Sequence, residues 1–170
     1  MTVTLRNMIV SGRFNRTFNL EEVAQKVPRV RYDPWSFSGA FIRLPPTIIL
    51  FENGKFNIVG AHTLQDVEYA ISWLMYHLSR AGYEVSEPTW QLRNCVAEVN
   101  LNEPINLDEL KHAVYVPEQF PGATVRAEGK TLQVFSSGKV IVLGIKSLDE
   151  LQHLEEFVRE VIESERTRTE

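Results

Sequence analysis

The most informative stretch of this 170-residue chain is Val134-Phe135-Ser136-Ser137-Gly138-Lys139, because a related stretch, Leu50-Phe51-Glu52-Asn53-Gly54-Lys55, stands 84 residues earlier. Three more blocks recur in the same order, at offsets between 83 and 87: Leu5–Val10 with Leu92–Ala97, Asp33–Ala40 with Val116–Ala123, and Val59–Ala61 with Leu143–Ile145. Four ordered blocks at nearly one offset indicate an internal duplication. We therefore expect a first repeat over residues 1–85, a second over 86–164, and an acidic, polar tail over 165–170.

The first repeat gives the clearest prediction of secondary structure. A strand around Asn7 precedes a short helix over Leu20–Lys26, for which Asn19 is a suitable N-cap. Three short strands follow, and Asn53-Gly54 is a strong signal for a hairpin between the last two. The expected strands are Gly39–Leu44, Thr47–Glu52 and Lys55–Gly60. A long helix closes the repeat, with an apolar stripe at Leu64, Val67, Ile71, Leu74 and Leu78.

The second repeat shows the same pattern. Its closing helix has a stripe at Leu148, Leu151, Leu154 and Val158, and Ser147–Glu150 predicts a capping box. Two helices per repeat, with strands clustered between them, favour an α+β fold in which an antiparallel sheet carries helices on one face. Alternation along the strand places Phe56 and Ile58 beneath the helices and leaves the other set, with Val59, on an open face.

Composition excludes several classes of protein. Apolar residues make up 44% of the chain and charged residues 24%, as in globular domains. The single cysteine, Cys95, cannot form an internal disulfide, and no apolar run approaches the roughly 18 residues of a membrane span. We find no nucleophile with its base, no paired carboxylates in a motif and no glycine-rich phosphate loop, so we predict no catalytic residue, no metal and no cofactor.

The charge of the chain argues against a nucleic-acid partner at first sight. The net charge is −4 and the sequence pI about 5.6, whereas phosphate binding depends on Lys and Arg. The charge is unevenly divided, however. Residues 1–85 contain nine basic and seven acidic residues, and residues 86–170 contain nine and fifteen. The excess acid lies mainly in the helices and tail of the second repeat, so the distribution of charge matters more than its sum.

The repeated motifs resemble those of the TATA-box-binding protein family. Phe120-Pro121-Gly122-Ala123, the strand ending in Phe135–Lys139, and the apolar strand ending in Gly144 carry the resemblance, together with an Asn on the first strand of each repeat. It extends from about Leu5 to Ser164 and indicates a diverged member with shortened end loops. The resemblance implies a saddle: two pseudo-symmetric repeats form one curved antiparallel sheet, four helices cover its convex face, and the concave face binds double-stranded, A/T-rich promoter DNA in the minor groove.

The resemblance also assigns roles to individual residues. It implies that four phenylalanines intercalate as wedges between base steps: Phe37, Phe51, Phe120 and Phe135. It implies a minor-groove floor of Asn7, Ile9, Val59, Asn94, Val96 and Leu143, in which the two asparagines read A·T base pairs. The implied phosphate contacts are Arg43, Lys55, Arg126 and Lys139. Tyr115 and Glu118 are the implied contacts to a factor-B-type transcription initiation protein.

Four departures from the family pattern bear on DNA binding. Glu52-Asn53 replaces the usual Ser-Ser after the first-repeat wedge, and Val59 and Leu143 replace threonines. Glu98 shares the open face with Asn94, where an acid is unfavourable beside DNA. The segments between paired wedge phenylalanines are short, with 13 and 14 residues.

Two functions follow from this combination of motifs and departures. The first is a general transcription initiation factor that binds and bends promoter DNA and recruits the factor-B-type protein. The alternative is a diverged interaction module that keeps its protein partners but has weak or altered DNA specificity. In either case we expect an intracellular protein without a membrane role, nuclear in a eukaryote, in the cytoplasm or nucleoid of an archaeon, or in the host cell of a virus. Dimerisation away from DNA is left open.

Overall fold

The computed structural model describes residues 1–167 of the chain. In chain order the elements are β1 (Thr2–Arg13), α1 (Leu20–Lys26), β2 (Val30–Arg31), β3 (Gly39–Arg43), β4 (Thr47–Phe51), β5 (Lys55–Ala61), α2 (Leu64–Arg80), β6 (Thr89–Asn100), the 3-10 helix η1 (Leu107–Glu109), β7 (Ala123–Ala127), β8 (Lys130–Val134), β9 (Lys139–Ile145), α3 (Leu148–Gln152) and α4 (Leu154–Thr167). The strands are hydrogen-bonded in the order β2-β3-β4-β5-β1-β6-β9-β8-β7 in one antiparallel sheet. The predicted α+β class is confirmed.

The chain forms two compact units that each contain one set of hairpins. The first unit is Asn7–Arg93, and the second contains Met1–Arg6 together with the described chain from Asn94 onward. The long strands β1 and β6 are therefore each shared, because the division falls immediately before Asn7 in β1 and before Asn94 in β6. Of the predicted tail, residues 165–167 continue α4, and residues 168–170 lie outside the described residues.

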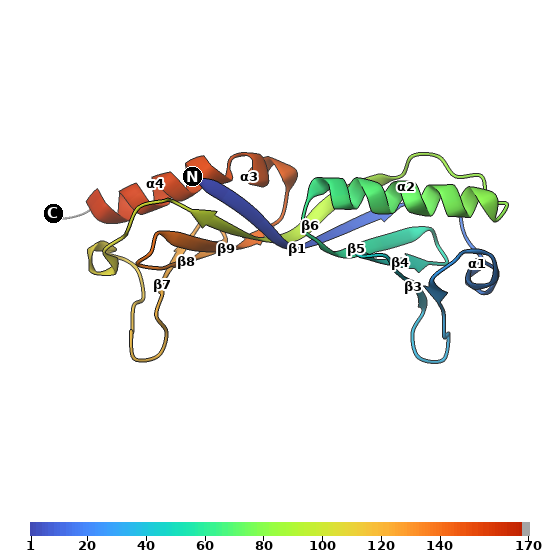
Figure 1. Cartoon of the computed structure of the whole chain (residues 1–170), viewed down its shortest axis with the longest axis horizontal. Helices are drawn as coiled ribbons and strands as arrows, with labels where there is room; N and C mark the ends of the chain where they lie inside the picture. Colours follow the sequence, from blue (N-terminus) through green and yellow to red (C-terminus); the bar gives the residue numbers. More distant parts are fainter. Residues whose placement is uncertain (168–170) are drawn as a thin grey trace. The chain divides into compact units, whose positions relative to one another are not determined.

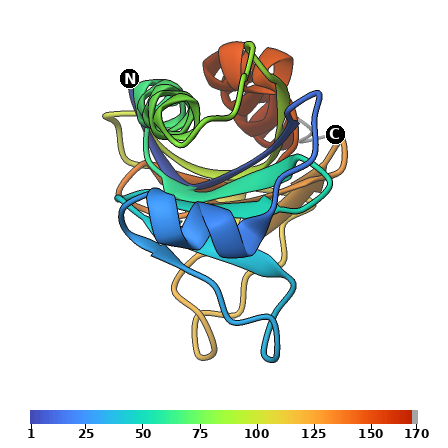
Figure 2. The ribbon, with the colours of Figure 1, turned by 90° about the vertical axis from the view of Figure 1, so that its right-hand side faces the viewer.

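The helices of the first unit form where the sequence predicts them. α1 begins after Asn19, whose side-chain oxygen accepts a hydrogen bond from the amide of Glu22 at 3.2 Å. α2 begins with a capping box, in which Thr63 and Asp66 bond to each other's backbone amides. Four residues of the predicted stripe are buried, but Leu64, the first residue of α2, is 38% exposed. In Figure 2 this unit faces the viewer, with α2 along one side of the strands and the loop before β3 extending from the other side.

The helices of the second unit depart from the predicted symmetry. The position of α1 is taken by η1, which has only three residues. The predicted long helix is divided into α3 and α4 at His153 (Figure 1). Leu154 and Val158 are buried in α4, whereas Leu148 and Leu151 in α3 are only half-buried. A single continuous amphipathic helix was therefore the wrong expectation, because the first half of its stripe does not enter the core.

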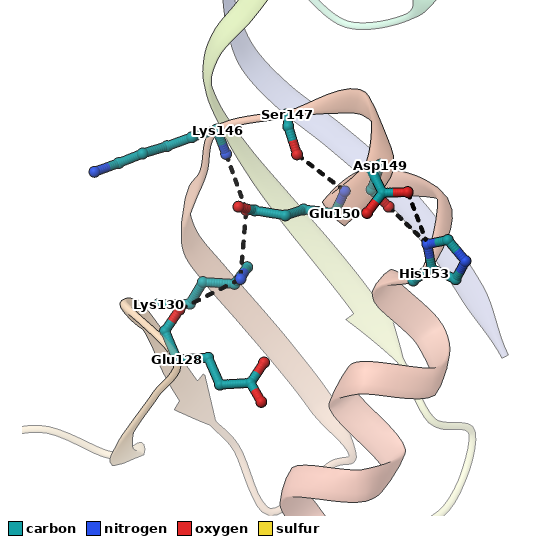
Figure 3. A network of polar contacts seen from close by, with 7 residues as sticks. All are labelled: Glu128, Lys130, Lys146, Ser147, Asp149, Glu150 and His153. Carbon is teal, nitrogen blue, oxygen red and sulfur yellow. Dashed lines mark hydrogen bonds and ion pairs between the residues drawn. The ribbon is translucent and has the colours of Figure 1, made fainter.

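The predicted capping box at α3 forms only in part. Ser147 accepts a hydrogen bond from the amide of Glu150 at 3.1 Å, but the Glu150 carboxylate accepts from the amide of Lys146 instead of the amide of Ser147. The same carboxylate lies 3.4 Å from Nζ of Lys130. This ion pair is drawn as a dashed line in Figure 3. Lys130 is 8% exposed, and its ammonium also lies 4.8 Å from the ring centroid of Phe157. This buried cation ties α3 and α4 to the start of β8.

Two hairpin glycines are fixed by close backbone packing. Gly54 and Gly138 have φ values of +92° and +94°, in the left-handed region that favours glycine. A Cβ on Gly54 would lie 2.6 Å from the carbonyl oxygen of Phe14, and a Cβ on Gly138 would overlap the carbonyl oxygen of Glu103. The predicted Asn53-Gly54 turn is thus confirmed. In both units, the chain after the long strand crosses directly over the turn.

Candidate nucleic-acid interface

Each unit leaves one face of its strands without helices. Along β5, Phe56 and Ile58 are fully buried, whereas Lys55, Asn57 and Val59 point the other way and Val59 is 38% exposed. β9 repeats the pattern, because Val140 and Val142 are fully buried and the alternating residues are half-buried. The predicted alternation is confirmed. The open face of each unit is the side opposite its long helices.

The structure brings the two predicted wedge phenylalanines of the first unit together. Phe37 lies in the loop before β3 and Phe51 ends β4, yet their ring centroids are 6.0 Å apart in an edge-to-face arrangement. Gly39 lies against both rings, and a Cβ there would be 3.0 Å from each. Phe41 adds a third ring, 5.2 Å from Phe37. Phe37 remains 42% exposed, so an aromatic edge is open to a partner.

The second unit repeats this aromatic arrangement. Phe120 and Phe135 have ring centroids 5.7 Å apart at 69°, and Phe120 is 38% exposed. Gly122 takes the position of Gly39, with a Cβ there 3.0 and 3.1 Å from the two rings. Two separate sequence motifs in each unit thus build one aromatic pair beside a glycine. No side chain larger than hydrogen fits between the rings without moving them.

The two asparagines predicted to read A·T pairs have different backbone conformations. Asn7 has a positive φ of +50°, whereas the φ of Asn94 is not positive. Asparagine tolerates the left-handed region better than most residues, so the backbone alone gives a reason for Asn at position 7. The pairing of β1 with β5 shifts register just after Asn7, between Met8 and Ile9. Asn7 is exposed and Asn94 is half-buried.

The predicted phosphate contacts lie at strand ends. Arg43 ends β3 and lines a hollow with Phe37, while Lys55 opens β5; both are exposed. Arg126 is exposed on β7, and it borders a hollow shared with α4. Lys139 opens β9, and its ammonium is 3.1 Å from Oε1 of Glu98. Three of the four predicted cations therefore have no carboxylate partner among the described residues.

Glu98, an acidic residue expected on the open face, is paired with two basic side chains. Its carboxylate lies 2.5 Å from Nη2 of Arg6 as well as 3.1 Å from Nζ of Lys139, and its side chain is 17% exposed. We expected an unpaired negative charge at Glu98, but this acid is paired with two cations on its own face. Glu52, the other acid expected near DNA, is exposed in the β4–β5 hairpin. Sequence reasoning missed Arg6, although it aligns with Arg93 one residue before the paired asparagines.

The loop before β7 carries the residues predicted to contact a partner protein. Glu118 is exposed in this loop, whereas Tyr115 is half-buried beside Val114, which pairs with Thr124 in an isolated bridge. The corresponding loop of the first unit places Trp35 at the position of Glu118, and Trp35 is 97% exposed. The alignment of Asp33-Pro34-Trp35 with Val116-Pro117-Glu118 is the signal that could have indicated this exposed indole.

Cys95 is a buried structural thiol. It is fully buried in β6, and burial raises the pKa of its thiol to about 11. A raised pKa keeps the sulfur protonated at neutral pH, where a reactive thiol needs the thiolate form. Among the described residues no cluster of three or more His, Cys, Asp and Glu could hold a metal ion, and no described helix is long and apolar enough to cross a membrane.

Comparison with known proteins identifies the family of the chain. The family model described as "Transcription factor TFIID (or TATA-binding protein, TBP)" matches residues 2–81 and 89–164. The TATA-box-binding protein of Sulfolobus acidocaldarius is 33% identical over 159 residues, which cover 88% of this chain and 81% of that protein. That of Methanocaldococcus jannaschii is 33% identical over 175 residues, covering 95% and 96%.

A solved structure shows the same fold. The structure titled "Methanococcus jannaschii TBP" matches with a TM-score of 0.79 and 30% identity, over 96% of this chain and 99% of that chain. The family model, the relatives and the shared fold thus define a duplicated α+β protein of the transcription-factor class. The chain belongs to the TATA-box-binding protein family, a family of transcription factors and not of enzymes.

Proposed function

We propose that this protein is a general transcription initiation factor that binds promoter DNA in the minor groove and bends it. The observation that carries the proposal is the matched pair of aromatic clusters, one per unit, each with an exposed phenylalanine edge on the helix-free side of the strands. Side chains that bend DNA from the minor groove are apolar wedges that enter a base step, and this family is itself the standing example of that mode.

The wedges act as supported pairs. Within each pair, Phe37 with Phe51 and Phe120 with Phe135, both rings form the wedge; the loop ring is the more exposed and packs edge-to-face against the ring at the strand end. An aromatic ring replaces part of the stacking that it disrupts. Steps such as TA unstack most easily, so the wedges favour A/T-rich sites that contain them. Shape and deformability supply this preference without any direct reading of base edges.

The groove floor supplies a second, weaker selection. Asn7 and Asn94 offer amide donors to the A·T acceptors of the minor groove, which distinguishes A·T from G·C and little more. Ile9, Val96 and Leu143 are half-buried and apolar, so they fit a groove without the guanine amino group. Arg43, Lys55, Arg126 and Lys139 contact phosphates, which set register and supply affinity.

A factor-B-type initiation protein binds at the loop before β7 in this proposal. Glu118 is exposed there and supplies a carboxylate to a basic partner. Tyr115, half-buried beside the Val114–Thr124 bridge, contributes to the same contact from the base of the loop. The protein works in the cell compartment that holds the DNA.

The alternative, an interaction module with weak or altered DNA specificity, is favoured by one observation. Val59 and Leu143 place apolar side chains where the family has hydroxyls, and Glu98 neutralises two cations of the open face. These changes remove polar contacts to DNA without touching the loop that carries Glu118. The two functions make different predictions for DNA binding alone.

Binding to matched duplexes tests the proposal. The protein is titrated at several stated salt concentrations against a duplex with a central TATA sequence and against a G·C-rich duplex of equal length. A preference for the TATA duplex that is lost in the Phe120→Ala, Phe135→Ala double variant supports minor-groove wedging. A Tyr69→Ala variant, which alters an exposed aromatic residue on α2, serves as the control and should bind like the wild type. Equal, weak binding of the wild type to both duplexes would contradict the proposal and favour the alternative.

A further inference from the structure

The two repeats carry matched three-residue clusters on their open faces, and the clusters differ in charge. The second unit contains Arg6, Glu98 and Lys139. On the long strands, the offset of 87 residues pairs Arg6 with Arg93 and Glu98 with Ser11. On the hairpins, the offset of 84 pairs Lys139 with Lys55. These three counterparts all lie in the first unit. The two cations are retained in both clusters. The central residue is a carboxylate in one and a hydroxyl in the other.

In the second unit, the cations of the cluster are neutralised. The Glu98 carboxylate uses Oε2 to bind Nη2 of Arg6 at 2.5 Å and Oε1 to bind Nζ of Lys139 at 3.1 Å. Its side chain is only 17% exposed, while those of Arg6 and Lys139 are 55% and 45% exposed. The carboxylate therefore lies beneath two cations that face solvent. Two oxygens held between an arginine and a lysine reproduce the way these side chains bind a phosphate group.

In the first unit, the cations of the cluster remain available. Nε of Arg93 donates a hydrogen bond to Oγ of Ser11 at 2.5 Å, which orients the guanidinium without neutralising it. Neither Arg93 nor Lys55 has a carboxylate partner among the described residues. Both line a hollow of about 420 Å³ that Arg13 also lines, so three basic residues border it.

We propose that Glu98 is an intramolecular phosphate mimic that masks the second unit's cluster, so that the two units bind the DNA backbone unequally. This inference rests on the proposed function. The first unit engages phosphates through Arg93 and Lys55, while Arg6 and Lys139 must first exchange their carboxylate partner for a phosphate. Position 98, with its counterpart at position 11, thereby sets how many phosphates the protein neutralises.

Charge substitutions at positions 11 and 98 test the masking. Each phosphate contact contributes about 0.9 to the slope of log affinity against log salt, so each added contact makes affinity fall about 3.5-fold further over a fourfold rise in salt. Glu98→Ser should bind a TATA duplex more tightly at low salt, with a slope steeper by about one to two. Ser11→Glu should bind more weakly, with a flatter slope. The double swap restores the wild-type net charge and should restore the wild-type slope.

Two further variants separate masking from simpler effects. Glu156→Ser removes the same charge from an exposed position on α4 and should leave the slope unchanged. Glu98→Gln keeps the shape of the side chain, so it tests the charge if Glu98→Ser alters folding, which thermal unfolding reports. Equal slopes for wild type, Glu98→Ser and Glu98→Gln, or an equal gain in Glu156→Ser, would overturn the masking while DNA binding itself stands. If the wild type shows no preference for the TATA duplex, the proposed function fails at that first measurement.

Discussion

Replacing Gly122 by alanine should damage DNA binding more than folding. A Cβ at Gly122 would lie 3.0 Å from Cε1 of Phe120 and 3.1 Å from Cε1 of Phe135. Carbon atoms pack best at about 3.5–4.0 Å, so the rings must move apart by about half an ångström. Phe120 is 38% exposed and can shift toward solvent, while the third neighbour, the carbonyl oxygen of Val134 at 3.2 Å, has to give by only a few tenths of an ångström. We therefore expect the free energy of unfolding to fall by about 1 kcal/mol, at the low end of the range for overpacking.

Under the proposed function, DNA binding cannot relax in this way, because the displaced rings are the proposed wedge. Unstacking a base step costs a few kcal/mol in minor-groove wedging, of which this family is the standing example, and a misplaced ring recovers less of that cost. We expect affinity for a TATA duplex to fall by about tenfold, or about 1.4 kcal/mol. The salt dependence should not change, since no cation is altered.

The assay combines three measurements on one set of proteins. Anisotropy of a labelled duplex gives affinity, energy transfer between dyes at its ends gives the bend, and urea unfolding gives stability. Gly82→Ala is the matched control: Gly82 has φ of +100° and a Cβ there would have no neighbouring atom within 4 Å, so alanine strains the backbone by about 1–2 kcal/mol but leaves the rings alone. If Gly122→Ala bends and binds the duplex like the wild type, the Phe120–Phe135 pair is not a wedge.

Three further outcomes follow from the structure. Lys130→Met should lower the free energy of unfolding by about 1 kcal/mol in urea titrations, because it leaves Glu150 without its buried cation. An unchanged free energy of unfolding would show that this partly exposed ion pair does not stabilise the fold. The pKa of the Cys95 thiol is raised from 9.0 to about 11 in the folded state. The buried thiol therefore contributes stability that is present below pH 9 and is lost as the pH rises through 11. Cys95→Ala should flatten that part of the pH dependence of the free energy of unfolding. Glu118→Arg should leave duplex affinity at low salt no weaker than wild type but reduce binding of a factor-B-type protein to the DNA complex, and an undiminished ternary complex in a gel shift would remove Glu118 from that contact.

Local signals in the sequence predict most of the first unit correctly. Asn19 caps α1 as expected, because a side-chain oxygen one residue before the helix can satisfy an amide without help from the rest of the fold. The Asn53-Gly54 hairpin forms for the same kind of reason, since a glycine with positive φ settles the turn. The pairing of each loop phenylalanine with one at a strand end could be predicted only from the recurrence of the motifs.

Long-range contacts explain what the sequence could not predict. The stripe through Leu148 and Val158 suggested one helix, but the chain breaks at His153 while Glu150 binds Lys130. Glu98 looked unfavourable on the open face because its partner Arg6 lies 92 residues away. Periodicity gives the face on which a residue lies, but it does not give the neighbour that the fold brings to it.

The hairpin glycines have a consequence for how the two halves of the gene can diverge. Gly54 and Gly138 are identical in both copies because backbone from the preceding loop fills the space that any side chain would need. The neighbouring Glu52-Asn53 and Ser136-Ser137, exposed in the same turns, have drifted apart. In a duplicated protein, positions that backbone contacts fix therefore stay alike, and positions without such contacts are free to specialise. The difference between Ser11 and Glu98 belongs to the second kind.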